Sequence, residues 1–173
     1  FYGKRPQGEV FTSCLEALKE VVKTVKALGI RNVKIGPETM GRPSQLGSLD
    51  EILRLCEGIE QAQPVIDWAH LYARDCGLLK KLSDFREVVE EIEKRLGTEA
   101  ARDMHCHFTR VEFTDKGEKR HHTIDEADYG PDFEMFAKII ADFELKPVII
   151  SESPILDLDA IKMRNILQKE LKS

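Results

Sequence analysis

Short apolar segments alternate with longer amphipathic segments along most of the 173 residues of this chain. The amphipathic segments repeat apolar residues at helical spacing, which predicts helices. The short apolar segments between them have the character of buried strands. Strands that alternate with helices usually pair in parallel, so the pattern predicts an α/β fold built on a parallel sheet.

The expected elements can be given by residue number. We expect helices at about 13–28, 48–56, 85–96, 133–140 and 158–167, and strands at 33–35, 64–67, 104–105 and 148–150. Two capping-box patterns, Ser13 with Glu16 and Ser48 with Glu51, predict the starts of the first two helices. The segment from Arg110 onward breaks the alternation and predicts a β-hairpin inserted between a strand and its helix.

Composition narrows the class of protein. The chain is 42% hydrophobic, which excludes a disordered chain and lets us expect one domain over residues 1–173. No apolar run approaches the ~18 residues of a membrane span and no signal-peptide pattern is present, so we expect no membrane partner. The net charge of −5 excludes nucleic-acid binding by bulk charge but allows a local basic site. The four cysteines form no C-x-x-C pair, which favours a reducing, cytoplasmic location.

Carboxylate and histidine residues follow the predicted strands one after another. Glu38 ends the first strand, Asp67 the second, His105 and His107 the third, and Glu152 the fourth. Because the carboxyl ends of parallel strands meet at one face, we expect these side chains to converge. Each residue alone could equally cap a helix or lie in a solvated loop. Their joint pattern favours a metal site.

The ligand types narrow the choice of metal. Carboxylates combined with imidazoles, without cysteine, suit Zn²⁺ or Mn²⁺. Ca²⁺ and Mg²⁺ are bound mainly by oxygen ligands. Asp67 and His70 also form an Asp-x-x-His pair directly after a buried strand. We therefore predict a divalent metal, with Zn²⁺ as first choice and Mn²⁺ as the alternative.

At these residues the chain resembles the endonuclease IV family (AP endonuclease family 2), within the xylose-isomerase-like TIM barrels. The segments that carry the resemblance are Pro37-Glu38-Thr39-Met40-Gly41 with Gln45-Leu46-Gly47, Val65-Ile66-Asp67-Trp68-Ala69-His70, Met104-His105-Cys106-His107, Arg120-His121 and Ser151-Glu152-Ser153-Pro154. They span nearly the whole chain but only the second half of that family's barrel.

The resemblance implies a TIM-barrel-like α/β fold with about four C-terminal βα units of a (β/α)8 barrel. A full barrel takes ~250 residues, so we expect this chain to be the C-terminal part of a larger barrel. Half a barrel leaves sheet edges open, which proteins avoid. We therefore expect the N-terminal half, or another chain, to cover these edges.

The resemblance also implies a set of metal ligands, namely Glu38, Asp67, His70, His105, His121 and Glu152. Glu38 would bridge two metals, and Asp67, His105 and Glu152 would complete one site with it. His70 and His121 would belong to a third metal. Lys119 stands where the family has an aspartate ligand, and Glu118 is close enough in sequence to replace it. His107 replaces an asparagine and could add or shift a ligand.

The function implied is a metal-dependent phosphodiester hydrolase that cleaves DNA at abasic sites. Glu38 and Glu152 would be catalytic residues that help to activate water and transfer protons. We expect Arg42, Arg74 and Arg120 to bind the substrate. Sugar isomerases and epimerases of the same barrel class have a similar Glu-Asp-His-Glu site. A metal-dependent isomerase or epimerase of sugars or sugar phosphates is therefore the alternative, and a non-catalytic scaffold is a third possibility.

Overall fold

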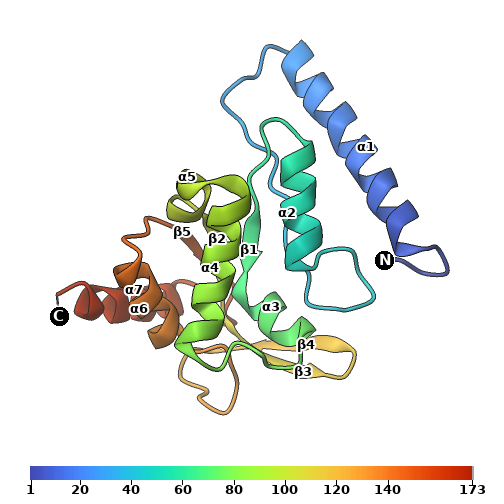
Figure 1. The fold of residues 1–173 in the computed structure, drawn as a ribbon. Coiled ribbons are helices and arrows are strands. Elements are labelled where there is room, and N and C mark those ends of the chain that lie inside the picture. Colours follow the sequence, from blue (N-terminus) through green and yellow to red (C-terminus); the bar gives the residue numbers. More distant parts are fainter. Residues whose placement is uncertain (173) are drawn as a thin grey trace.

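A parallel sheet lies at the centre of the computed structural model, which describes residues 1–172 (Figure 1). The strands β1 (Val65–Asp67), β2 (His105–Phe108) and β5 (Val148–Ser151) pair in parallel in the order β1-β2-β5. The segment expected as the first strand forms only isolated parallel bridges, from Ile35 to Ala62 and from Glu38 to Val65. The α/β fold with a parallel sheet is thus confirmed, and the bridges bring Glu38 to the side of β1.

Helices cover the sheet and connect its strands. In chain order they are α1 (Gln7–Ala27), α2 (Leu49–Gly58), α3 (Trp68–Arg74), α4 (Leu82–Leu96), α5 (Thr98–Arg102), α6 (Phe133–Asp142) and α7 (Asp157–Glu170). The short helices α3 and α5 were not expected, because elements of seven and five residues are too short to show a helical period. In Figure 1, α1 runs along the outer side of α2, away from the sheet.

The two capping-box predictions had different outcomes. Ser48 caps α2 as predicted: its side chain accepts a hydrogen bond from Glu51 N, and the Glu51 carboxylate accepts one from Ser48 N. The predicted start at Ser13 is wrong, because α1 already begins at Gln7, directly after Pro6. Proline has a fixed φ and no N–H, so it suits a helix start. Inside the helix, the Ser13 hydroxyl donates to the Glu9 carbonyl.

The predicted hairpin is confirmed, with β3 (Arg110–Thr114) paired antiparallel to β4 (Gly117–His122). It packs against α3 at the carboxyl end of the sheet. A bulge shifts the register: Glu112 pairs with Arg120, whereas Phe113 pairs with Glu118, which leaves Lys119 unpaired. Because of this extra residue, Glu118 and His121 lie on the same side of the hairpin, with Nε2 of His121 3.2 Å from Oε1 of Glu118.

An aromatic core fixes the strand ends. The fully buried aromatic side chains are Trp68, Phe85, Phe108, Phe133 and Phe136. The rings of Trp68 and Phe136 lie 4.5 Å apart between centroids. Trp68 directly follows Asp67, and Phe108 directly follows His107. Core packing therefore holds these two candidate ligands at the end of the sheet. No helix among residues 1–172 is both long and apolar enough to cross a membrane.

Candidate metal centre

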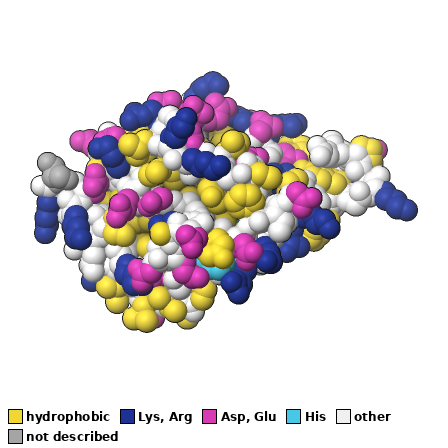
Figure 2. Space-filling model, turned by 90° about the horizontal axis from the view of Figure 1, so that it is seen from below, with side chains coloured by type: hydrophobic (Ala, Val, Ile, Leu, Met, Phe, Trp, Pro, Cys, Tyr) yellow, Lys and Arg dark blue, Asp and Glu magenta, His cyan; other side chains and the backbone are white. Residues whose placement is uncertain are grey.

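Carboxylate and histidine side chains gather at the carboxyl end of the sheet, as the sequence predicts. Seven residues make up this ligand cluster: Glu38, Asp67, His70, His107, Glu118, His121 and Glu152. Three overlapping trios within it have candidate ligand atoms that all lie within 4.8 Å of one another. The face seen from below shows histidine surface between Asp and Glu side chains, with Lys and Arg next to it (Figure 2).

One imidazole nitrogen faces several carboxylates in the first part of the cluster. Nδ1 of His107 lies 3.3 Å from Oε1 of Glu38 and 3.3 Å from Oε1 of Glu152. The same nitrogen lies 3.8 Å from Oδ2 of Asp67. Glu38 comes from the segment beside β1, Asp67 from β1 and His107 from β2, and Glu152 directly follows β5. We call these four residues the first ligand group.

The second ligand group consists of His70, Glu118 and His121. Nε2 of His70 lies 3.2 Å from one oxygen of Glu118, and Nε2 of His121 lies 3.2 Å from the other. Nδ1 of His70 donates to the Thr39 carbonyl at 2.7 Å, and Nδ1 of His121 donates to the Glu152 carbonyl at 2.9 Å. A carbonyl only accepts, so in each neutral ring the hydrogen is on Nδ1 and the lone pair is on Nε2.

This tautomer assignment separates the two ligand groups. Backbone carbonyls that hold Nδ1–H are the usual means of aiming the other ring nitrogen at a metal. His70 also lies 3.4 Å from Glu38 and from Asp67, but through the nitrogen that Thr39 already engages. His70 therefore offers its free nitrogen to the second group and not to the first.

Unpaired buried atoms test whether the cluster fits a metal. Asp67 Oδ2, His107 Nδ1 and His121 Nε2 are buried and have no hydrogen-bond partner within residues 1–172. Buried polar atoms are nearly always paired, so three orphans in one cluster need an explanation. Each faces another ligand atom at 3.2–3.8 Å without hydrogen-bond geometry. A divalent cation bound between these atoms would satisfy them, and the residues present therefore fit such an ion.

The pKa shifts reflect the crowding of charge. Burial raises the pKa of Glu38 and of Asp67, although nearby histidines oppose the shift. His121 and His70 hold the pKa of Glu118 well below its usual range. Burial opposes protonation of His70, but Glu118 and Asp67 outweigh it and raise the pKa of His70 to about 9. Carboxylates packed this closely favour a bound cation, whether proton or metal.

The placement of His105 differs from the expected one. The sequence suggested that the third strand ends near His105, but β2 begins there and continues to Phe108. His107 pairs in register with Asp67, whereas His105 pairs with Val65. His105 and His107 alternate onto the same face of β2, with ring centroids 5.6 Å apart. His107 is therefore the histidine that joins the cluster, and His105 lies nearer the amino end of the strand.

The arginines expected to bind substrate lie in three different settings. Arg74 points inward, and its Nη1 donates to the carbonyls of Met40, Arg42 and Gln45 at 2.7–3.1 Å. It thus orders the loop that follows Glu38. Arg120 contacts His122 at 3.4 Å, on the face of β4 opposite His121. Arg42 is exposed in the loop that follows Glu38, beside the cluster.

Comparison with known proteins finds a relative and a family for this chain. An uncharacterized protein of Methanocaldococcus jannaschii is 33% identical over 161 residues, which cover 93% of this chain and 58% of that relative. The chain thus spans less than two thirds of the relative's length. The sequence model of the xylose isomerase-like TIM barrel family matches residues 1–170. The chain belongs to the xylose isomerase-like TIM barrel family.

Proposed function

We propose that this protein is a metal-dependent phosphodiester hydrolase, similar to endonuclease IV, that cleaves DNA at abasic sites. The observation that supports this most is the presence of the second ligand group, His70, Glu118 and His121, beside the first. Neighbouring metal sites are typical of phosphodiester hydrolases, because both the attacking and the leaving oxygen need stabilisation. A sugar isomerase or epimerase, the alternative function, is served by the first group alone.

We propose Zn²⁺ as the metal and Mn²⁺ as the alternative, because imidazole and carboxylate ligands suit both. A bound divalent cation would stabilise negative charge on the phosphate as a Lewis acid. The first group would hold one ion through Glu38, Asp67, His107 and Glu152. The second group would hold another through Glu118 and the Nε2 atoms of His70 and His121.

Solvent exposure separates the roles of the carboxylates. The side chains of Glu38 and Glu152 are 33% and 34% exposed, whereas that of Asp67 is 0% exposed. Of these three carboxylates, only those of Glu38 and Glu152 can therefore meet a substrate. Burial raises the pKa of Glu38, which suits a group that takes a proton from the attacking water. We propose Glu38 as this base and Glu152 as the residue that assists proton transfer. Asp67 would only hold the metal.

An abasic nucleotide that stayed inside the duplex could not reach a cluster at the end of the sheet. We propose that the abasic nucleotide swings out of the helix to reach Glu38 and Glu152. Along β5, Val148 and Ile150 are 55% and 42% exposed. We propose that the N-terminal half of the barrel, or another chain, covers this edge. The four cysteines are free, which supports the proposed cytoplasmic location.

Metal analysis combined with two substrates tests the proposal. The full-length protein is purified, its metal content is measured, and it is incubated with an abasic-site duplex and, separately, with keto sugars and their phosphates. Two or more Zn²⁺ ions per chain with strand cleavage would support the hydrolase. One Mn²⁺ with sugar turnover would support the isomerase instead. A complete protein without bound metal would contradict both functions.

A further inference from the structure

A cleft with a volume of about 610 Å³ lies between the loop after Glu38 and the tip of the β3–β4 hairpin. Residues 42–44 form one wall, and residues of the segment 114–119 form the other. Glu118 belongs both to this cleft and to the second ligand group, where its two oxygens face His70 and His121. The cleft therefore opens directly beside the ligand cluster.

Contact between two backbone segments fixes the shape of this cleft. Glu118 N donates to the Gly41 carbonyl at 3.0 Å. A Cβ atom at Gly117 would lie 2.2 Å from the same carbonyl oxygen, and Gly117 has a φ of +92°. Only glycine allows this approach and this backbone angle. Arg42 and Lys116, each next to one of the two glycines, are thereby brought to opposite walls of one cleft.

The charges in the cleft favour an anion. Lys119 is paired with Glu112 at 2.6 Å, so its charge is offset. Arg42 and Lys116 are exposed, and neither forms an ion pair with any residue of 1–172. Two acids also line the cleft: both oxygens of Glu118 are turned to histidines, and Asp115 offsets only one of the two positive charges of Arg42 and Lys116. An unpaired guanidinium and an unpaired ammonium that line one cleft are a combination suited to phosphate.

We propose that this cleft binds a second phosphate group of the substrate, next along the strand from the phosphate at the ligand cluster. This assignment rests on the proposed hydrolase function. Because it requires a substrate with neighbouring phosphates, it implies a polynucleotide. The cleft and the cluster share Glu118, so one molecule with neighbouring phosphates can occupy both. A sugar without a phosphate would leave Arg42 and Lys116 unused.

Binding of DNA to single-residue variants tests the proposal. The affinity of the full-length protein for an undamaged fluorescent duplex is measured by anisotropy over a range of salt concentrations. Lys116→Ala and Arg42→Ala should each weaken binding by roughly threefold to tenfold and lower the slope of log K against log salt by about 1. Lys116→Arg should restore binding, because it restores the charge.

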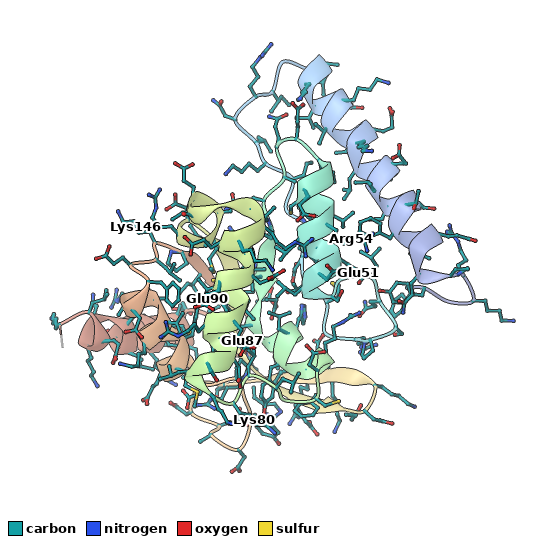
Figure 3. The ribbon with its side chains drawn as sticks, viewed as in Figure 1. Glu51, Arg54, Lys80, Glu87, Glu90 and Lys146 are labelled. Carbon is teal, nitrogen blue, oxygen red and sulfur yellow. The ribbon has the colours of Figure 1, made fainter. Side chains whose placement is uncertain are left out.

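Lys146→Ala is the matched control. Lys146 is exposed and directly precedes Pro147 and β5, at the end of the sheet opposite the hairpin (Figure 3). Its loss should leave affinity within about twofold of the wild type, because long-range surface charge is screened by salt. Equal affinity of the wild type and Lys116→Ala would overturn the proposal. An equal loss from Lys146→Ala would do the same, because it would indicate diffuse charge.

Cleavage, measured separately, distinguishes this proposal from the proposed function. If the wild type cleaves an abasic-site duplex but Lys116→Ala and Arg42→Ala bind DNA like the wild type, the cleft is not a phosphate site and the hydrolase function stands. If the wild type does not cleave, the hydrolase function fails. In that case the salt slopes of the variants still decide whether the cleft binds phosphate.

Discussion

Nε2 of His70 lies 3.2 Å from Oε2 of Glu118, and this contact joins helix α3 to the β3–β4 hairpin. The Nδ1 atom of the same ring donates to the Thr39 carbonyl, so the neutral ring would present a lone pair to a carboxylate. The two groups repel each other unless a proton or a metal ion lies between them, and Glu118 helps to raise the pKa of His70 to about 9. The hairpin therefore contributes to the ligand cluster, although the sequence places it outside the alternating pattern of strands and helices.

Removal of Glu118 should cost one metal ion and leave the first ligand group intact. Glu118→Ala in the full-length protein should lower the Zn²⁺ content by about one ion per chain, because two imidazoles alone bind zinc weakly. Metal content by mass spectrometry measures this. Lys119→Ala is the matched control, since Lys119 pairs with Glu112 outside the cluster. The assignment fails if Glu118→Ala keeps the full metal content.

The two histidines of β2 should differ in their effect on metal binding. Nδ1 of His107 faces Glu38 and Glu152 at 3.3 Å, whereas His105 belongs to none of the ligand trios formed by residues 1–172. His107→Ala should therefore weaken binding at the first group by tenfold or more, roughly the effect of removing a supporting residue at a metal site. His105→Ala should leave the affinity unchanged. Competition with a chromogenic chelator measures both, and the reverse order would contradict the account.

Arg74 should matter for stability rather than for direct contact with substrate. Its side chain is 10% exposed, and it bonds three carbonyls of the loop after Glu38. Arg74→Ala leaves these carbonyls without their donor, so the free energy of unfolding should fall by about 1–3 kcal/mol. Arg42→Ala, at an exposed position in the same loop, should change it by less than ~0.5 kcal/mol. Urea denaturation compares them, and equal stabilities would refute the inward role of Arg74.

Glu51 gives a pH-dependent prediction. Its carboxylate accepts hydrogen bonds from Gly47 N, Ser48 N and the Tyr2 hydroxyl, on the side of α2 that faces α1 (Figure 3). Burial alone would raise the pKa of Glu51, but these hydrogen bonds hold it below the usual 4.5. Because the folded pKa is lowered, the ionised carboxylate stabilises the fold above pH 4.5, and this contribution is lost as pH falls through the folded pKa.

Glu51→Gln tests this linkage. At pH 7 the variant should be less stable than the wild type by about 1–2 kcal/mol, because the amide is a weaker acceptor than the carboxylate. The difference should shrink as the pH is lowered below 4.5, since the wild-type side chain then becomes neutral too. Urea denaturation at several pH values measures it. A difference that stays constant down to pH 3 would show that Glu51 is not held ionised by these contacts.

The parts of the fold predicted from sequence are those with local signals. Ser48 and Glu51 mark the start of α2 through a capping box, and Val148 to Ile150 mark β5 through a continuous apolar run. The start of α1 was misplaced because a capping-box spacing at Ser13 lies inside a helix that Pro6 begins. Local patterns cannot show which of two possible starts the chain uses when both are compatible with a helix.

The sequence predicts part of the cluster of carboxylates and histidines, but its exact members depend on long-range geometry. The sequence indicated Glu38, Asp67 and Glu152 at strand ends, and they converge. The choice between His105 and His107 depends on where β2 pairs with β1, which no local signal records. Alternation along the strand would have kept both as candidates. Arg74 points inward because the loop after Glu38 passes beside it and offers it three carbonyls. The path of that loop cannot be predicted from the sequence.

Cleavage of a duplex with one abasic site by the full-length protein tests the central claim most directly. The wild type loaded with Zn²⁺ should cut the strand at that site, and Glu38→Gln should cut it at least about a hundredfold more slowly, because it loses the proposed base and a metal ligand. An undamaged duplex serves as the control and should stay intact. Equal rates for the wild type and Glu38→Gln, or no cleavage by either, would contradict the proposed function.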